Sequence, residues 1–215
     1  MVSNGRPEHD RLGFDQELRR RHAVEFLAGV DEVGRGPLAG PVVAAAVILP
    51  PHVDVPGADD SKKLTPAGRA LLALEVRRVA LAIGFGSVSP AVIDRINILE
   101  ATRLAMRRAL TALRPVPQLI VVDGWPLPGT PFRQEALPKA DSLSLAVACA
   151  SIVAKVRRDR LMARYGRVYP QYDFGGHKGY PTPGHLQALE RHGPCPLHRQ
   201  SFGPVSQLRL QLAGT

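Results

Sequence analysis

Four carboxylates stand at places where a protein can hold a metal ion against a phosphate. Asp31 and Glu32 end one apolar run, Asp123 ends another, and Asp141 directly precedes an alanine-rich segment. A carboxylate at the end of a buried strand is held rigidly and faces a crevice. Hard divalent cations take oxygen ligands, and two such ions roughly 4 Å apart can hold the attacking water and the leaving oxygen of a phosphodiester. The four acids therefore predict metal-assisted cleavage of a phosphodiester.

Each of these acids also has a purely structural interpretation. Asp123 alone could be a turn or cap residue, and Asp141 could be the N-cap of the helix that follows it. Asp31 and Glu32 could form a salt bridge with Arg35. Two adjacent acids between apolar segments need some partner, because an unpaired buried charge is costly. The residues alone leave open whether that partner is a cation or Arg35.

Two short segments have features of nucleic-acid contacts. The glycines of Gly34-Arg35-Gly36 let the backbone approach a ligand, and exposed N–H groups there could contact a phosphate or a ribose 2′-OH. A plain turn between strands explains the same residues equally well. Tyr180 follows Lys178 closely, so its ring could stack while the lysine meets a phosphate. The alternative is a tyrosine that packs its loop onto the core.

The charge balance favours an anionic partner. The 215 residues suit one domain and carry a formal net charge of +9. Ten Lys or Arg against three Asp or Glu in residues 151–215 leave +7 of that charge in the last third. This excess is typical of proteins that bind nucleic acid, an anionic surface or an acidic substrate, although a solvated basic face would look the same.

Cysteine content and hydropathy point to a reducing compartment. Cys149 and Cys195 are too few for a disulfide framework, and Cys149 lies among small apolar residues, as a buried thiol would. Cys195 and His198 have the spacing of half a zinc site but lack a second pair. The sequence has no stretch of 18 apolar residues, so no transmembrane helix is predicted. The polar start does not resemble a signal peptide. We expect a cytoplasmic monomer.

Apolar and β-branched runs alternate with segments of helical period. Strands are predicted at 26–33, 42–49, 83–87 and 118–122. Helices are predicted at 15–22, 66–81, 90–113 (in one or two pieces), 144–165 and 185–192, with Thr65 as the N-cap of the second. Loops are predicted at 125–131 and 169–183, and prolines break the tail. This order predicts an α/β fold with a mixed sheet, comprising a charged leader (1–24), a catalytic core (25–165) and a C-terminal helical lobe and tail (166–215) within one compact unit.

Taken together, these segments resemble the ribonuclease HII family from about Ala28 to Val205. The first segment, AGVDEVGRGPLAGPVVAAA at 28–46, and the ordered set of acids are highly specific, whereas the DSK and VDG pieces are weak singly. The remaining matching segments are 60–64, 97–102, 121–124, 141–159, 177–180 and 197–202.

The resemblance implies a ribonuclease H-like mixed β-sheet flanked by helices, with a C-terminal helical lobe. It implies an endoribonuclease that hydrolyses RNA in RNA–DNA hybrids and at single ribonucleotides embedded in duplex DNA, leaving 3′-OH and 5′-phosphate ends by two-metal-ion catalysis with Mg²⁺ or Mn²⁺. Asp31, Glu32, Asp123 and Asp141 match the family's catalytic, metal-binding acids.

The resemblance also implies a set of nucleic-acid contacts. The Gly-Arg-Gly loop would read the ribose 2′-OH through its backbone, and the tyrosine would stack at the sugar on the DNA side of an RNA–DNA junction. Two further residues would lie near the nucleic-acid backbone. The implied nucleic-acid-binding residues are Gly34, Arg35, Gly36, Ser61, Lys62 and Tyr180.

One residue departs from the family pattern. The usual Lys-Gly-Asp before the long helix is Lys139-Ala140-Asp141 here. Alanine adopts a positive φ only at a cost. If the family's glycine uses such a conformation, we expect Asp141 to sit slightly differently in this chain.

Other functions fit the residues less well. A non-catalytic hybrid-binding protein of the same fold would keep the basic face but lose acids, and a nuclease acting on DNA alone would not need the Gly-Arg-Gly loop and Tyr180. The related ribonuclease HIII type carries a large extra N-terminal domain, whereas 27 residues precede Ala28. The tail at 207–212 faintly resembles peptides that dock on sliding clamps, without their terminal aromatic; a frayed end is the alternative.

Overall fold

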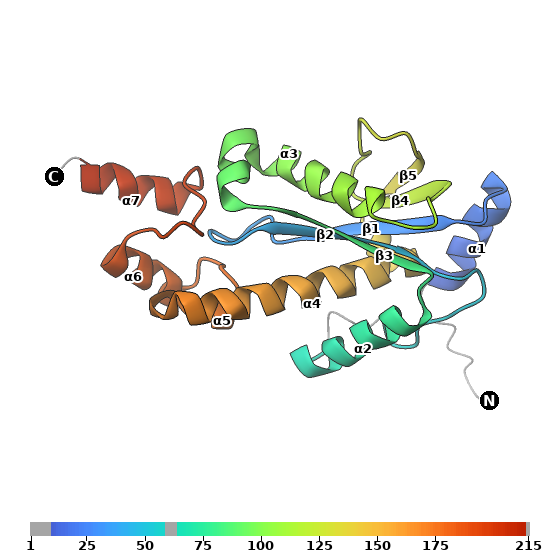
Figure 1. The fold of residues 1–215 in the computed structure, drawn as a ribbon, viewed down its shortest axis with the longest axis horizontal. Coiled ribbons are helices and arrows are strands. Elements are labelled where there is room, and N and C mark those ends of the chain that lie inside the picture. The colour runs from blue at the N-terminus through green and yellow to red at the C-terminus, as the bar shows by residue number, and fades with distance from the viewer. Residues whose placement is uncertain (1–9, 59–63, 214–215) are drawn as a thin grey trace, which may run out of the picture.

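The computed structural model describes residues 10–58 and 64–213 and contains one five-stranded mixed sheet (Figure 1). Ser61 and Lys62 lie outside the described residues. The strand order is β3-β2-β1-β4-β5, in which β1 and β2 and also β2 and β3 pair antiparallel, while β1, β4 and β5 run parallel. The strands are β1 (Leu27–Val33), β2 (Val42–Ile48), β3 (Ala82–Val88), β4 (Leu119–Asp123) and β5 (Arg133–Leu137). The predicted α/β class with a mixed sheet is confirmed.

Helices cover both faces of the sheet (Figure 1). Helix α3 lies on one face, α4 and α2 lie on the other, and α5, α6 and α7 gather at the end of the molecule away from α1. The helices are α1 (Arg11–His22), α2 (Pro66–Val79), α3 (Pro90–Thr111), α4 (Leu145–Val168), α5 (Phe174–His177), α6 (Pro183–His192) and α7 (Gly203–Ala213), and 3₁₀ turns span Ala140–Ser142 and Pro170–Tyr172. Among the described residues, no helix is long and apolar enough to cross a membrane.

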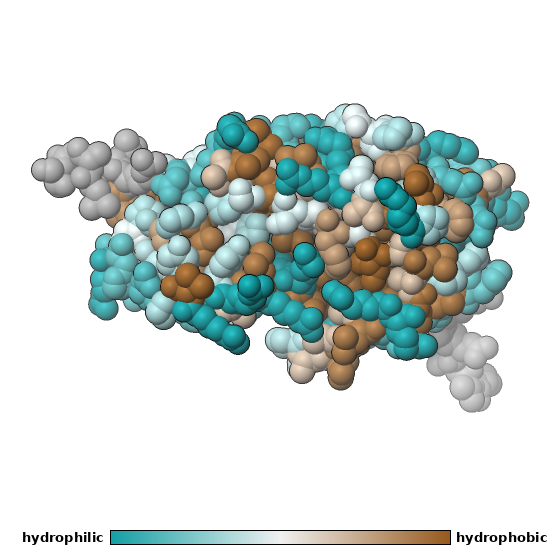
Figure 2. Space-filling model, viewed as in Figure 1, coloured by the Kyte–Doolittle hydropathy of each residue, from teal (hydrophilic) through white to brown (hydrophobic). Residues whose placement is uncertain are grey.

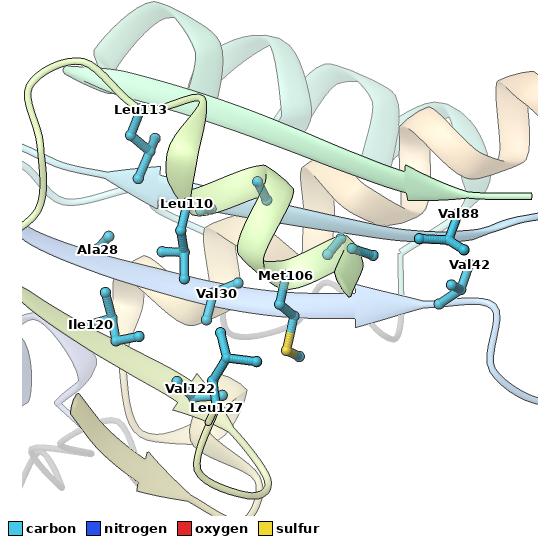
Figure 3. Close-up of a cluster of buried hydrophobic side chains, with 14 of the residues drawn as sticks. Ala28, Val30, Val42, Val88, Met106, Leu110, Leu113, Ile120, Val122 and Leu127 are labelled. Atoms are coloured by element: carbon cyan, nitrogen blue, oxygen red, sulfur yellow. The ribbon is translucent and has the colours of Figure 1, made fainter. Parts of the chain in front are cut away.

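Alternating side chains of β1 build two separate cores. Ala28 and Val30 face α3, where they pack with Met106 and Leu110 (Figure 3). Burying each large apolar side chain stabilises the fold by about 1.5–3 kcal/mol. On the other face, a Cβ at Gly29 would lie 2.2 Å from backbone atoms of α4. Glycine is therefore required where α4 crosses β1, two residues before Asp31.

Helix α3 is broken into two pieces, one of the two possibilities that the sequence left open. The helix contains one residue with a non-helical backbone, Asn97, whose φ is 65°. Its side-chain oxygen accepts hydrogen bonds from the N–H groups of Leu99 (2.9 Å) and Glu100 (3.1 Å). Asparagine tolerates a positive φ better than most residues, and here it also caps the second piece of the helix.

Several elements differ from the prediction, including the predicted loop at 169–183, which contains the 3₁₀ turn Pro170–Tyr172 and α5. Strand β5 was not predicted, because its sequence RQEAL is polar and lacks the β-branched pattern. The proline-broken tail instead contains α7, with Pro204 in its first turn, where a missing N–H costs nothing. Helix α1 begins at Arg11, capped by Asp10, four residues before the predicted start, and it buries Leu18.

Candidate active site

Parallel pairing of β1 and β4 brings two of the acids to one edge of the sheet. Val30 lies opposite Val122, so Asp31 and Asp123 are the next residues on neighbouring strands. Asp31 is 6% exposed, and its carboxylate accepts a hydrogen bond from the N–H of Glu32 (2.7 Å). The edge lies at the carboxyl ends of the parallel strands, where α/β proteins bind ligands.

The acids at this edge repel one another. Burial, together with the charges of Glu32 and Asp123, raises the pKa of Asp31 to about 8, against the opposing effect of the Ser151 hydroxyl. Burial and Asp123 also raise the pKa of Glu32. Carboxylates arranged in this way favour a bound cation, because a positive charge among them would relieve both the repulsion and the loss of solvation.

The salt bridge to Arg35 explains only part of this cluster. Arg35 Nη1 lies 3.3 Å from Glu32 Oε1 and lowers the pKa of that carboxyl against the effect of burial. Within the described part of the chain, Asp31 has no Lys, Arg or His at ion-pair distance. A salt bridge to Arg35 therefore explains the charge of Glu32 but leaves the charge of Asp31 unbalanced.

The turn before α4 connects Asp141 to Asp123. The N–H of Ala140 donates to Asp123 Oδ1 at 2.6 Å, and Arg11 Nε of α1 donates to the Asp141 carbonyl at 3.0 Å. The N-cap of α4 is Ser144, so the alternative of Asp141 as its N-cap is wrong. The positive φ in this turn (59°) falls on Lys139, and Ala140 begins the 3₁₀ turn. Alanine is therefore compatible with the backbone here.

The donor set suits a hard divalent cation at an open site. In the described ranges, no group of three or more His, Cys, Asp or Glu side chains is arranged so that it could hold a metal ion. A cleft of about 50 Å³ instead opens beside Glu32 and Asp123. Magnesium sites commonly use one or two carboxylates and keep their remaining positions for water and substrate phosphate. By charge and by donor type, the acids at this edge fit Mg²⁺ or Mn²⁺.

Two arginines without exposed surface shape the Gly-Arg-Gly loop. Arg199 donates to the carbonyls of Gly34, Arg35 (2.8 Å) and Gly40 (2.9 and 3.0 Å). Arg158 lies so close to Gly34, whose φ is 92°, that a Cβ there would be 2.1 Å from its Nε. Glycine is thus required at position 34. Both arginines are fully buried, so they do not contribute to a basic surface although they count toward the positive charge of residues 151–215.

Arg158 also joins this loop to the segment that carries Tyr180. Its guanidinium donates to Ala39 (3.2 Å), Pro41 (3.0 Å) and Lys178 (3.0 Å). Tyr180 is 42% exposed, which rules out the alternative of a tyrosine packed into the core. A Cβ added at Gly36 would lie 3.8 Å from the Tyr180 ring. The two segments predicted to contact nucleic acid are therefore neighbours.

Other cationic residues of the C-terminal third do form a basic surface. Arg157, Arg160 and Arg164 of α4 line a groove of about 240 Å³ together with Arg77 of α2. The guanidinium of Arg157 lies 4.5 Å from the centre of the Phe85 ring. These four arginines are exposed, in contrast to Arg158 on the same helix. Figure 2 shows hydrophilic side chains gathered over α4 and beside α2 on this face of the molecule.

A chain of hydrogen bonds between buried histidines holds the backbone of Tyr180. The N–H of Cys195 donates to His198 Nδ1 (3.0 Å), so the proton of His198 is on Nε2, which lies 3.1 Å from His185 Nε2. His185 then carries its proton on Nδ1 and donates to the Tyr180 carbonyl (2.8 Å). Every donor has an acceptor only if both rings are neutral. Cys195 and His198 are used inside this network, and Cys149 is a buried thiol, as predicted.

This network predicts a loss of stability in acid. Burial lowers the pKa of His185, and burial together with the charge of His185 lowers the pKa of His198 to about 4. The unfolded chain binds more protons than the folded one below about pH 6.5. His198 therefore contributes stability that is present above pH 6.5 and is lost as the pH falls toward 4.

Urea unfolding at pH 7.5 and pH 5 measures this effect. His198→Gln keeps an N–H donor toward His185 but cannot titrate. We expect the free energy of unfolding to fall by about 1–3 kcal/mol more in the wild type than in the variant between these pH values. Equal losses in both proteins would show that other groups cause the acid sensitivity.

Comparison with known proteins identifies relatives along the whole fold. The family model for ribonuclease HII matches residues 28–205. Ribonuclease HII of Moorella thermoacetica is 54% identical over 202 residues, covering 94% of this chain and 98% of that protein. Ribonuclease HII of Geobacter sulfurreducens is 52% identical over 194 residues, covering 90% and 89%.

Solved structures agree with the sequence relatives. Ribonuclease H2 from Pyrococcus horikoshii OT3 superimposes with a TM-score of 0.74 at 29% identity, covering 88% of this chain and 100% of that chain. A chain of the PCNA:RNase HII complex from Archaeoglobus fulgidus superimposes with a TM-score of 0.71 at 30% identity, covering 85% and 96%. The predicted ribonuclease H-like fold is confirmed, and the chain belongs to the ribonuclease HII family.

Proposed function

We propose that this chain cuts the strand at single ribonucleotides embedded in duplex DNA, in addition to RNA in RNA–DNA hybrids. Membership of the ribonuclease HII family makes it a ribonuclease H, an endoribonuclease of RNA–DNA hybrids. The observation that carries the proposal is the adjacency of three features: the buried, mutually repelling acids, the Gly34–Gly36 loop and the exposed Tyr180 ring.

The four acids have one shared task in this proposal. Asp31, Glu32, Asp123 and Asp141 would hold Mg²⁺ or Mn²⁺ at the edge of the sheet. Bound divalent cations supply a polarised water for in-line attack and charge stabilisation for the departing 3′ oxygen. The β1–β4 pairing fixes Asp31 and Asp123, and the hydrogen bond from Ala140 fixes Asp123 against the turn of Asp141. The ends left by this reaction are a 3′-OH and a 5′-phosphate.

The residues around the acids would select the ribonucleotide. Arg199 and Arg158 hold carbonyl groups of the Gly34–Gly40 segment inward, which leaves backbone N–H groups of Gly34, Arg35 and Gly36 as the means to meet a 2′-OH. Ser61 and Lys62 remain proposed contacts of the nucleic-acid backbone. Sugar and phosphate contacts of this kind set the register of the strand on the protein.

Tyr180 is expected to determine preference for the junction. Tyr180→Ala should lower cleavage at a single embedded ribonucleotide by about 5- to 100-fold, the range for removing one stacking partner. A long hybrid offers many equivalent positions, so its cleavage should fall less. Tyr180→Phe keeps the ring and serves as the control. Equal losses on both substrates would contradict this role.

Three labelled duplexes test the substrate class. All-DNA, DNA with one ribonucleotide, and a long RNA–DNA hybrid are incubated with Mg²⁺, Mn²⁺ or chelator. The proposal predicts metal-dependent cutting of the second and third and none of the first. If only the hybrid is cut, the proposed activity at single ribonucleotides is wrong. Cutting of all-DNA would favour a DNA nuclease, and folded protein that cuts nothing would favour a non-catalytic binding protein.

We propose a sliding clamp as the protein partner of the C-terminal helix α7. One solved relative forms part of a complex with PCNA, and α7 projects from the molecule at the end away from α1 (Figure 1). Sliding-clamp binding by the full chain and by a chain lacking the last ten residues tests this contact. Equal affinity of the two chains for the clamp would show that the tail does not bind it.

A further inference from the structure

Trp125 is a large aromatic side chain that none of the roles above uses. It is the only tryptophan of the chain, directly follows the Asp123-Gly124 pair, and is 80% exposed. Single exposed apolar side chains are common on protein surfaces and by themselves indicate nothing. Trp125, however, lines the cleft that opens beside Glu32 and Asp123, and so does Leu99 of α3, another exposed large apolar residue.

The loop that carries Trp125 is held at both ends. The N–H of Gly124 donates to the Leu137 carbonyl (2.9 Å). Leu127 exchanges two hydrogen bonds with the side chain of Gln134 (2.8 and 3.3 Å) and is buried beside Val122 (Figure 3). The exposed ring therefore projects from a fixed support, so little conformational freedom would be lost when a ligand packs against it.

The size of the cleft limits what can enter it beside the ring. About 50 Å³ is room for a few waters, which suits a phosphate and the edge of a sugar but not a whole base. Two successive residues of the loop that follows the catalytic acids each neighbour an exposed ring: Arg35 shares the cleft with Trp125, and Gly36 lies next to Tyr180.

We propose that Trp125 is a second nucleotide-contacting platform, whose ring packs on a sugar of the cleaved strand on the 5′ side of the cut. Tyr180 would contact the sugar on the 3′ side. The inference rests on the proposed function, because it requires the scissile phosphate to lie at Asp31, Glu32 and Asp123. Contacts to sugar and phosphate position a strand without reading its sequence, so a ring that packs on a sugar would act at any sequence.

The fluorescence of the single tryptophan reports this contact directly. Asp31→Asn protein in Mg²⁺ is titrated with a duplex that contains one central ribonucleotide. The same titration uses a duplex whose cleaved strand begins at the ribonucleotide and so lacks the 5′ neighbour. We expect a saturable emission change with the first duplex and a much smaller one with the second. An unchanged emission at saturation, or equal responses to both duplexes, would overturn the assignment.

Kinetics on an otherwise wild-type background provide the second readout. Trp125→Ala should raise KM for the full duplex by about 5- to 100-fold with kcat retained, because the contact binds substrate and transition state alike. Trp125→Phe should recover most of the loss. Leu71→Ala, at another well-exposed apolar residue, on α2 outside the cleft, should change neither constant. A fall in kcat with unchanged KM, or no recovery with phenylalanine, would contradict a packing role.

Wild-type cleavage of the same duplex distinguishes failure of the proposed function from failure of the role of Trp125. If the wild type does not cut at the embedded ribonucleotide, the proposed function fails. If it cuts normally while the tryptophan emission stays silent on binding, only the role of Trp125 fails.

Discussion

Asp31→Asn is expected to lower cleavage of every substrate by at least about 1000-fold, the scale of removing one member of a catalytic constellation. The protein should remain folded. Burial and the charges of Glu32 and Asp123 raise the pKa of Asp31 to about 8, so the ionised form is costly in the folded state. Asparagine has nearly the same shape without that charge, and its oxygen can still accept the N–H of Glu32. Near-normal activity in Mg²⁺ would remove Asp31 from the mechanism.

The stability of the wild type relative to Asp31→Asn should fall as the pH rises. The folded pKa of Asp31 is above its unfolded value of 3.8. The folded chain therefore binds more protons between pH 4 and 8, and the contribution of Asp31 to stability is lost as the pH rises through this window.

Thermal unfolding in chelator should show this loss as a difference in melting temperature between the two proteins that grows with pH. The Asp31→Asn protein should gain in melting temperature relative to the wild type between pH 5 and pH 8.5, and Mg²⁺ should narrow the gap by stabilising the wild type. A constant difference across this range, with no effect of Mg²⁺, would contradict the burial of an unbalanced carboxylate at this site.

Arg199→Met is expected to destabilise the fold by about 2–5 kcal/mol, because it leaves buried carbonyl acceptors of Gly34, Arg35 and Gly40 without donors. For a chain of this size, that corresponds to a fall in melting temperature of roughly 5–15 °C. The loop that neighbours Tyr180 loses its support in the same step. Cleavage at a single ribonucleotide should therefore fall at temperatures where the variant is still folded.

Matched substitutions distinguish this role from a general effect of charge. Arg199→Lys keeps the charge, but a single ammonium cannot span three carbonyls as the planar guanidinium does, so its loss should approach that of Arg199→Met. Arg191→Met removes one charge from an exposed position of α6 and should leave stability within about 0.5 kcal/mol. A stable, fully active Arg199→Met protein would show that the loop holds its shape without the guanidinium.

The sequence predicted the elements whose pattern has a local cause. Strands β1 to β4 follow apolar runs, and Thr65 caps α2. The sequence left open whether α3 is one piece or two, and the structure breaks it at Asn97. The acids at the ends of β1 and β4 were recognised because a carboxylate at the end of an apolar strand is held rigidly and faces a crevice. Their pairing at one edge then follows from the parallel register of the two strands.

Features that depend on distant partners could not be predicted in this way. Arg158 and Arg199 have the same residue type and local setting as exposed arginines, and only the fold shows their carbonyl partners. Strand β5 is polar and forms because β4 offers it a free edge. The positive φ of the turn before α4 falls on Lys139 rather than on Ala140, a choice that no spacing of residues indicates.

Mapping the cut in one end-labelled duplex tests the central claim most directly. The strand contains a single ribonucleotide, and the wild type and the Asp31→Asn protein are compared in Mg²⁺ and in chelator. We expect one cut by the wild type in Mg²⁺, on the 5′ side of the ribonucleotide, with 3′-OH and 5′-phosphate ends, and none in the other three reactions. Cutting in chelator, cutting by Asp31→Asn, or a cut placed without regard to the ribonucleotide would contradict it.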